Sequence, residues 1–578
     1  MFVDDIQCDN LFFAIIVRSP SASGQLISIQ CDNLSDDYTL ITAKDIPGHN
    51  ALSDSEFPLI ADKYVSYIGQ PVGLITGPSY EHLENLIPSC KIVIEEKHSI
   101  LDMNEPLSYA YATKTLDVDV GTVKDGTGEN EDEEIIVEGI YSTSVQAHHP
   151  SETGAALVFI EDDFVTIYSA TQCVSHLRKS VCGALNIDEK NIMVNEVDLG
   201  IHYDSKLWYS SFISVLAAVC AFKIKKNVKL VTTREEDFLY APKRIATEAS
   251  YKSVVNANGV IKKTDIEIKA NFGSAQFYSE KIIDEIMTAA IGTVKLGNLN
   301  LKCSAMFSNL PPSSTFAGYG ASQGTFLLER HLAAIADKLR YEPFELRGKI
   351  MQKKRSKRLA DINTTVPIET VFTKIHNSLT RKSDFKRKWA SYEMLRHTAH
   401  SEEKIEPLRG IAMTSVKSYA ACVVELEINP LNYKPMIKGI WIDICSENAQ
   451  NKYEVKYLMM QTILCAIGWA CTEDIKYIDG KIKINKNCFE YIQNAIEFEN
   501  VHVDFIEAVE ENKIRSTEVS EPALNYEELT FSLFTPSFIQ AISQAVDYNF
   551  TSLPVTVVDI WKALRKIKSE KQNGETEK

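Results

Sequence analysis

Short β-type runs alternate with turns and amphipathic segments along most of this chain. In residues 11 to 120, strands are predicted for the runs LFFAIIV, YTLITA, PVGLITG and KIVIEE, and a short helix for Tyr80 to Leu86. The same order of strand, loop and helix recurs after residue 150 and again after Arg409. This pattern predicts an α+β (mixed α/β) fold and excludes an all-helical one.

The middle of the chain contains two predicted hairpins, 155–160 with 164–169 and 247–255 with 260–270. Amphipathic helices are predicted to start at Val174 and to run through Leu328 to Leu339. The apolar stretch Leu207 to Phe222 contains three serines and falls short of the roughly 18–20 residues that a membrane span requires. We expect a buried helix there and no membrane anchor.

The C-terminal part is predicted to add strands at 423–428 and 439–444 and a helix over 456–469. Asp479-Gly480 between two apolar runs is a strong signal for a two-residue hairpin. Thr535 is predicted to cap a last helix that has Pro536 at its first position. The tail after residue 565 is expected to be disordered.

Charge and cysteine usage restrict the classes of partner and compartment. The 578 residues include 61 Lys and Arg against 78 Asp and Glu, a net charge of −17, which repels phosphate backbones. Nucleic acid is therefore not expected as a partner. The N-terminus lacks the pattern of a secretory signal, and the twelve cysteines form no CxxC pair. These features predict a cytoplasmic protein with buried thiols.

An acidic stretch divides the chain into predicted domains. Residues 123–135 have no apolar periodicity and many charges, so we expect a solvated linker there. The expected domains are then 1–122, 136–408 and 409–565, followed by the disordered tail 566–578. Between residues 349 and 400 the chain is basic, at 353–358 and 381–388, and a solvated helical face is the favoured interpretation.

Motifs that reveal chemistry by themselves are scarce. No GxGxxG follows a strand, and neither GxxxxGK[ST] nor HExxH occurs. His148-His149 with Glu152 suggests a metal site, but adjacent histidines on a strand point to opposite faces, so a structural role is favoured and no metal ligands are assigned. Glu521 before a proline is most simply an exposed turn residue. The residues alone thus indicate no mechanism.

The ordered set of segments nevertheless resembles the large, molybdenum-cofactor-binding subunit of the xanthine dehydrogenase and aldehyde oxidase family. The opening LFFAIIVRSP and YIGQPVGLI are similar to its N-terminal hammerhead domain. VQAHHPSE is similar to the family's Q-x-H-x-x-x-E pattern, FAGYGASQ at 316–323 to its FRGFGGPQ loop, and SEPALN to its G-E-P segment. The likeness runs nearly end to end, although no single motif decides it.

The resemblance implies a fold and a chemistry. The fold is a hammerhead-type domain followed by molybdopterin-binding-type domains, and the chemistry is hydroxylation of a purine, another N-heterocycle or an aldehyde with oxygen from water. Glu521 matches the general base, and Gln146 the glutamine beside an oxo ligand of molybdenum. The loops with Gly200 and with Gly318, Tyr319 and Gly320 match cofactor-binding loops. Iron–sulfur and flavin subunits are implied as partners, because this chain lacks clustered cysteines.

The chain departs from the family at these loops. The family's GGGFGGKE corresponds to residues 200–207, where only Gly200 and Lys206 remain. Glycines there permit positive φ and close approach of backbone amides to a ligand. Ala317 replaces the arginine of FRGFGGPQ, and Ser520 replaces the glycine before Glu521. From Arg409 the chain passes almost directly to CVVELEINP, without the family's GQG region, so we predict an internal deletion.

Three hypotheses follow from the resemblance and its departures. The first is an active hydroxylase subunit with a molybdenum-pterin cofactor and a small-molecule substrate, based on Gln146 and Glu521. The second, which we favour, is a degenerate chain with impaired or lost cofactor binding that serves as a scaffold. Its partners would be iron–sulfur and flavin subunits or a paralogous large subunit. The third is a small-molecule binding protein that reuses the remaining cavity.

Overall fold

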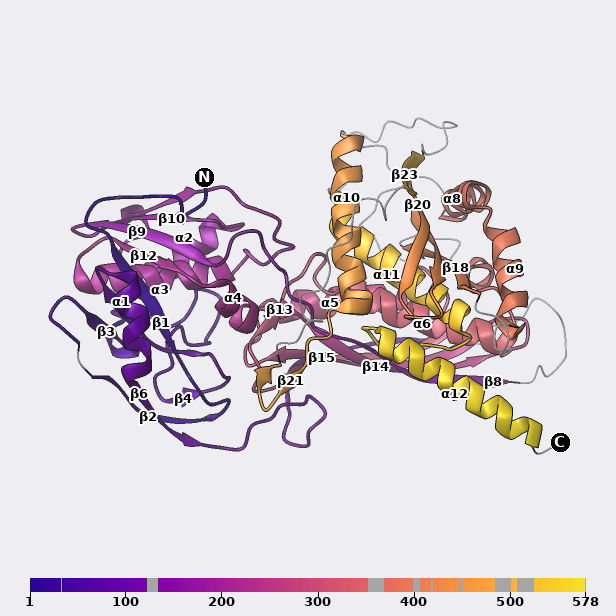
Figure 1. The fold of residues 1–578 in the computed structure, drawn as a ribbon, viewed down its shortest axis with the longest axis horizontal. Coiled ribbons are helices and arrows are strands. Elements are labelled where there is room, and N and C mark those ends of the chain that lie inside the picture. The colour runs from indigo at the N-terminus through magenta and orange to yellow at the C-terminus, as the bar shows by residue number, and fades with distance from the viewer. Residues whose placement is uncertain are drawn as a thin grey trace.

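The computed structural model describes residues 1–32, 34–121, 134–351, 368–398, 406–416, 419–445, 451–483, 500–506 and 524–576. Two lobes lie side by side (Figure 1). The first lobe contains most of residues 1–240, and the second contains the remaining sheets and the helices from α5 onward.

A seven-stranded mixed sheet forms the core of the first lobe. Its strand order is β11-β10-β9-β12-β1-β5-β3, with β1 parallel to β12 and antiparallel to β5. Apolar helix α3 (Tyr209–Ile224) is buried against it beside α2 (Val174–Leu185). The strands are β1 (Phe12–Arg18), β3 (Thr39–Ile41), β5 (Pro71–Gly77), β9 (Ala155–Glu161), β10 (Phe164–Ser169), β11 (Ile192–Glu196) and β12 (Val228–Val231).

This sheet joins residues from both sides of the predicted linker. The strands β1, β3 and β5, which precede the predicted linker, share this sheet with β9 to β12, which follow it. The reason is non-local pairing, which a boundary drawn from local composition does not detect. Residues 122–133, most of the predicted linker, lie outside the described residues.

A smaller sheet, β4-β2-β6, packs beside the first one. Its strands are β2 (Gly24–Cys31), β4 (Tyr64–Val65) and β6 (Cys90–Glu96), and α1 (Tyr80–Leu86) precedes β6. Cys31 and Cys90 face each other across β2 and β6 and form a disulfide. The expectation of buried free thiols is therefore wrong for this pair, because register pairing brings two distant cysteines together. The other described cysteines are free thiols.

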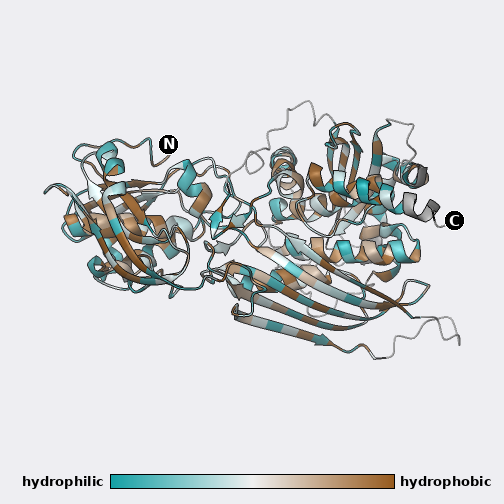
Figure 2. Ribbon diagram, turned by 60° about the horizontal axis from the view of Figure 1, so that its bottom comes forward, coloured by the Kyte–Doolittle hydropathy of each residue, from teal (hydrophilic) through white to brown (hydrophobic). Residues whose placement is uncertain are grey.

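The second lobe contains a five-stranded sheet of order β7-β16-β15-β14-β8. Helices α5 (Ser279–Ile291) and α6 (Ala321–Leu339) pack together and cover one face. Hydrophilic and hydrophobic residues alternate along its strands (Figure 2). The open face carries ion pairs such as Lys252–Glu138 and Lys302–Glu267. The strands are β7 (Ala110–Val118), β8 (Ile135–Thr143), β14 (Ala246–Val255), β15 (Ile261–Gly273) and β16 (Asn298–Phe307).

The C-terminal part forms a four-stranded sheet of order β18-β19-β20-β23, against which α8, α9 and α11 pack. Only three residues separate β18 from β19, which makes them a tight antiparallel pair. The elements are β18 (Leu408–Val416), β19 (Ala420–Ile428), β20 (Pro435–Cys445), β23 (Val501–Ile506), α8 (Ile368–Ser383), α9 (Phe385–Thr398), α10 (Lys452–Ile467) and α11 (Tyr526–Val546).

Shorter elements complete the fold. Strand β13 (Lys243–Arg244) pairs with β17 (Ser313–Ser314), and β21 (Tyr477–Ile478) with β22 (Lys481–Ile482). A π-helical turn at Gly468–Thr472 continues α10. The remaining helices are α4 (Arg234–Tyr240), α7 (Pro343–Ile350) and α12 (Val557–Thr576), with 3-10 turns at Ala43–Asp45, Ile87–Ser89 and Glu189–Asn191.

The mixed α/β class, both central hairpins, the Asp479-Gly480 hairpin and the early strands are confirmed. The basic segment 381–388 is not simply a solvated face. Lys382 pairs with Asp443 at 2.6 Å and with Asp504 at 2.9 Å, and Lys388 pairs with Glu425 at 2.6 Å. These lysines hold the helix ends against the C-terminal sheet. Residues 353–358 lie outside the described residues.

Two predictions near the C-terminus are wrong. Helix α11 begins at Tyr526, capped by the side chain of Asn525, so Pro536 lies inside the helix and Thr535 caps nothing. Burial of Leu529, Phe531 and other apolar residues upstream outweighs the local cap signal. The tail is helical as far as Thr576 in α12, because lysine, glutamate and glutamine favour helix.

Helix α3 is confirmed as a buried core helix that is too short to cross a membrane. Within the described part of the chain, the stretch Lys452–Thr472, which is α10 and its π-helical turn, is the one helix long and apolar enough to do so. Half of that stretch is buried inside the fold, with Ile463, Ala466 and Trp469 fully enclosed.

A substitution at Gly410 in β18 tests how closely α11 packs on the C-terminal sheet. A Cβ at Gly410 would overlap the backbone carbonyl of Ala541, which cannot rotate away. We expect Gly410→Ala to lower the free energy of unfolding by about 1–3 kcal/mol, measured by urea denaturation. Gly183→Ala is the control, since nothing lies within 4 Å of a Cβ at that position in α2. Equal stability of Gly410→Ala and the parent chain would contradict the packing described here.

Candidate functional site

Gln146 lies just after β8, where the chain bridges to Arg244 of β13. Its side chain is 1% exposed, and every hydrogen bond the structure records for its amide goes to the protein. The Oε1 atom accepts from Nε of Arg244 at 3.0 Å. The Nε2 atom donates to the carbonyl of Cys465 at 2.8 Å and to Oε1 of Glu473 at 3.1 Å. Both ends of the amide are thus engaged.

Arg244 is the centre of this arrangement. Its guanidinium lies over three aromatic rings, 3.8 Å from the centroid of Phe316, 4.1 Å from Trp469 and 4.3 Å from Phe531. The side chain has no exposed surface, and burial lowers its pKa to about 9, so it stays charged at neutral pH. Cation–π attraction is strongest for desolvated cations, which favours this position. We call Gln146, Arg244, Glu473, Phe316, Trp469 and Phe531 the Arg244 cluster.

Glu473 supplies the carboxylate of the Arg244 cluster. It follows the π-helical turn after α10, and Gly468 leaves room for it, since a Cβ there would overlap Oε1 of Glu473. Its other oxygen lies 3.9 Å from Nε2 of His149. Burial raises the pKa of Glu473 to about 7. The sequence patterns do not single out Glu473, since the adjacent acids Glu473 and Asp474 in TEDIKY resemble ordinary turn residues.

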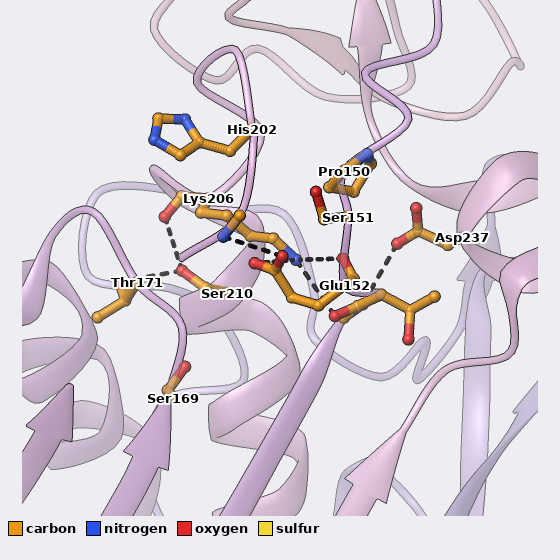
Figure 3. Close-up of polar contacts among 12 residues, drawn as sticks. Pro150, Ser151, Glu152, Ser169, Thr171, His202, Lys206, Ser210 and Asp237 are labelled. Carbon is orange, nitrogen blue, oxygen red and sulfur yellow. Dashed lines mark hydrogen bonds and ion pairs between the residues drawn. The ribbon is translucent and has the colours of Figure 1, made fainter. Parts of the chain in front are cut away.

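The loop after β11 places Lys206 beside Glu152 (Figure 3), and Gly200 of the same loop also contacts Glu152. The Gly200 amide donates to Oε2 of Glu152 at 3.1 Å. Lys206 donates to the carbonyls of Glu152 and Thr153, each at 3.2 Å, and lies 3.8 Å from Oε1 of Glu152. Gly200 therefore binds the chain's own Glu152, the last residue of the quoted Q-x-H-x-x-x-E pattern.

Two residues of this loop adopt left-handed backbone, and one of them, Asp204, stands where the quoted family motif has glycine. Tyr203 has φ 44° and Asp204 has φ 70°. The buried ring of Tyr203 stacks on Phe316 with centroids 5.6 Å apart and meets Phe531 edge-on at 5.9 Å. The positive-φ backbone therefore persists, at a cost of about 1–3 kcal/mol per residue. The ring of Tyr203, at the position of the motif's phenylalanine, is thus packed inside the fold.

Residues of the loop before α6 pack against different parts of the structure. Phe316 stacks on His148 at 4.5 Å and joins the Arg244 cluster. Tyr319 instead meets Tyr278 edge-on at 6.2 Å, at the start of α5. Gly318 and Gly320 have φ of 86° and 104°, and a Cβ on Gly318 would overlap the side chain of Glu528 in α11. The three predicted cofactor-loop residues 318–320 thus pack against α5 and α11.

His148 and His149 have separate structural roles. The two ring nitrogens of His148 lie 3.0 Å from the carbonyl of Pro242 and 2.8 Å from that of Thr315. Burial lowers its pKa to about 3 although these carbonyls favour protonation, so the ring is neutral at pH 7. His149 stacks on Phe238. Across the described residues, no three His, Cys, Asp or Glu side chains converge as metal ligands would. Glu521, the predicted general base, lies outside the described residues.

Comparisons with known proteins agree with this scaffold. Residues 109–351 match the family model of the molybdopterin cofactor-binding domain. Aldehyde oxidase 2 of Rattus norvegicus is 31% identical over 363 residues, which cover 61% of this chain and 26% of that protein. Aldehyde oxidase 4 of Mus musculus is 27% identical over 368 residues, 62% and 27% of the two chains. The chain thus spans about a quarter of the length of these curated relatives.

Solved structures share the fold at low sequence identity. CO dehydrogenase from Oligotropha carboxidovorans superposes with a TM-score of 0.83 at 12% identity, over 99% of this chain and 96% of that one. Quinoline 2-oxidoreductase from Pseudomonas putida 86 gives 0.78 at 11% identity, over 98% and 96%. Residues 109–351 thus match the molybdopterin cofactor-binding domain, and the chain as a whole shares the fold of these solved structures. This confirms the resemblance inferred from the motifs.

The described residues do not fit a pterin dithiolene at Gln146. Such a group needs open space beside the amide and accessible backbone amides in the neighbouring loops. The Gln146 amide is engaged by Arg244, Glu473 and Cys465. The ring of Tyr203 and the Arg244 cluster occupy the space beside it. The protein's own side chains and backbone therefore enclose the Gln146 amide.

The raised pKa of Glu473 gives a pH-dependent prediction. Between its ordinary value of 4.5 and about 7, the folded chain binds this proton more tightly than the unfolded chain, so the unfolding free energy falls as pH rises. Glu473→Gln removes the buried charge. We expect it to change stability little at pH 5 and to stabilise the chain by about 3 kcal/mol at pH 8.

Urea denaturation of both chains at the two pH values measures this difference. Glu267→Gln, on the open face of the five-stranded sheet, is the control for a carboxylate in water. A Glu473→Gln effect of the same size at pH 5 and pH 8 would contradict burial of the carboxylate in the Arg244 cluster.

Proposed function

We propose that this chain is a non-catalytic member of the molybdenum hydroxylase family, which serves as a scaffold subunit and does not load the molybdenum-pterin cofactor. The observation that carries the proposal is the saturated amide of Gln146. In the family resemblance this amide contacts an oxo ligand of the metal. Here its acceptor and donor groups bind Arg244, Glu473 and a backbone carbonyl.

Two further features support this function. The loop at 200–207 lacks four of the motif's five glycines, and one of the replacements, Asp204, adopts left-handed backbone. Only three residues join β18 to β19. This connection is too short to contain the GQG region that the family resemblance implies between these strands. A binding site built from several loops loses its preorganisation when one of them is missing.

Molybdenum analysis tests the proposal directly. We expect substoichiometric molybdenum in the full chain after expression in a host that makes the pterin cofactor, measured by plasma mass spectrometry on folded protein. The Cu,Mo-CO dehydrogenase, whose name records its molybdenum, is the positive control in the same host. One molybdenum per chain would overturn the proposal and make hydroxylation of purines, N-heterocycles or aldehydes the function to assay.

A scaffold also requires partners. The proposed partners are iron–sulfur and flavin subunits or a paralogous large subunit of the same family. Affinity purification of the full chain from its native cells, followed by quantitative mass spectrometry, should recover at least one of these in near-equal amount. An unrelated bait of similar acidity controls for charge-driven binding. Recovery of the chain without any family subunit would contradict the scaffold function.

A further inference from the structure

A small enclosed cavity lies next to the Arg244 cluster but is separate from it. Its volume is about 80 Å³, equal to about two to three water molecules at roughly 30 Å³ each. Residues 147–150, the loop at 205–209, helix α4 and residues 241–243 line it. It is too small for a nucleotide or a pterin, and it has room for an ion of a few non-hydrogen atoms.

The cavity wall carries more positive than negative charge. Lys206, Arg234 and Lys243 contribute cations, whereas Asp237 is the single carboxylate among the lining residues. Glu152 behind Lys206 adds a second acid at 3.8 Å, so the local balance is three cations against two acids. The ring faces of Tyr209 and Phe238 complete the wall and exclude water from these charges. This balance is the reverse of the chain's overall charge of −17.

Lys243 lacks the partners that a buried ammonium group needs. Its side chain is 2% exposed and donates to a single acceptor, the carbonyl of Ala241, at 3.0 Å. No carboxylate of the described residues lies within 4.0 Å of its Nζ, in contrast to Lys206. An ammonium group has three N–H donors, and burying one without partners is costly. Burial lowers the pKa of Lys243 to about 8, so the group is still mainly charged at neutral pH.

A second polar group on the wall also lacks a partner. The hydroxyl oxygen of Ser205 is buried and has no hydrogen-bond partner among the described residues. It lies in the loop of Lys206 and faces the same cavity as Lys243. The remaining N–H groups of Lys243, whose Nζ also lies 5.6 Å from the centroid of the Phe238 ring, and the Ser205 hydroxyl on the same cavity wall can both donate to a single acceptor. An anion with several oxygens satisfies both and balances the excess positive charge.

We propose that this cavity is a binding site for a small oxyanion, such as a phosphate or a short carboxylate, held by Lys243 and Ser205 with Lys206 and Arg234 around it. The site is independent of molybdenum loading, because none of these four residues belongs to the Arg244 cluster. Arg234, which is exposed and donates to the carbonyls of Pro150 and Ser151, lies at the outer edge and can guide anions inward.

The test compares the full chain with Lys243→Met at constant ionic strength. Inorganic phosphate and acetate, titrated separately against chloride, are the probes, with thermal shift and isothermal calorimetry as readouts. We expect at least one probe to raise the Tm of the parent chain by about 2 °C or more at saturation. Lys243→Met should weaken that binding at least about tenfold. In probe-free buffer its Tm should equal or exceed that of the parent, because an unpaired buried charge has been removed.

Two further variants accompany Lys243→Met, one as a control outside the cavity and one as a second change inside it. Lys302→Met on the open sheet face removes an exposed lysine and should keep the full response to the probe. Ser205→Ala removes only one oxygen and should reduce the affinity severalfold, which keeps the proposal testable if Lys243→Met does not fold. No response in the parent chain, or equal responses in the parent chain, Lys243→Met and Ser205→Ala, would overturn the proposal.

Discussion

The guanidinium of Arg244 is the interaction on which the arrangement around the site depends. It joins β13 to the loop before α6 through Phe316, to the end of α10 through Trp469 and to α11 through Phe531. These segments come from four distant parts of the sequence. A buried charge is tolerated only where polar partners and aromatic faces replace water. The positions of these segments therefore depend on one another. Gln146 and Glu473 are the polar members of the Arg244 cluster.

The chain shares the overall fold of the similar solved structures, although its loop at 200–207 differs from the quoted family motif. Tyr203 and Asp204 keep the left-handed conformation that glycine makes easy, and the stacking of Tyr203 on Phe316 offsets part of its cost. The two glycines before α6 keep positive φ, and the side chain of Glu528 packs where a Cβ on Gly318 would lie. Both loops thus combine left-handed backbone with closely packed side chains.

Local signals predicted most of the elements, and non-local contacts decided the rest. Hairpins and the helix at Tyr80 follow from turn residues and periodicity, so they could be predicted. The pairing of β1 with β12 joins residues over two hundred positions apart, and no local pattern encodes it. Thr535-Pro536 looked like a helix start, but burial of the preceding turns moved the start to Tyr526. The roles of Arg244 and Glu473 could not be predicted for the same reason, because their partners lie on other segments of the chain.

Filling the space around Gln146 with side chains affects the folding free energy of the chain. A void of roughly 300 Å³, the lower end of ligand pockets, would cost about 7 kcal/mol at about 24 cal/mol per Å³. That is comparable to the whole stability of a domain, about 5–15 kcal/mol. The Arg244 cluster and Tyr203 remove this cost by occupying the space themselves. In the proposed scaffold function, the side chains of the Arg244 cluster occupy the surroundings of Gln146, so the packing of the cofactor-free chain there does not depend on a bound group.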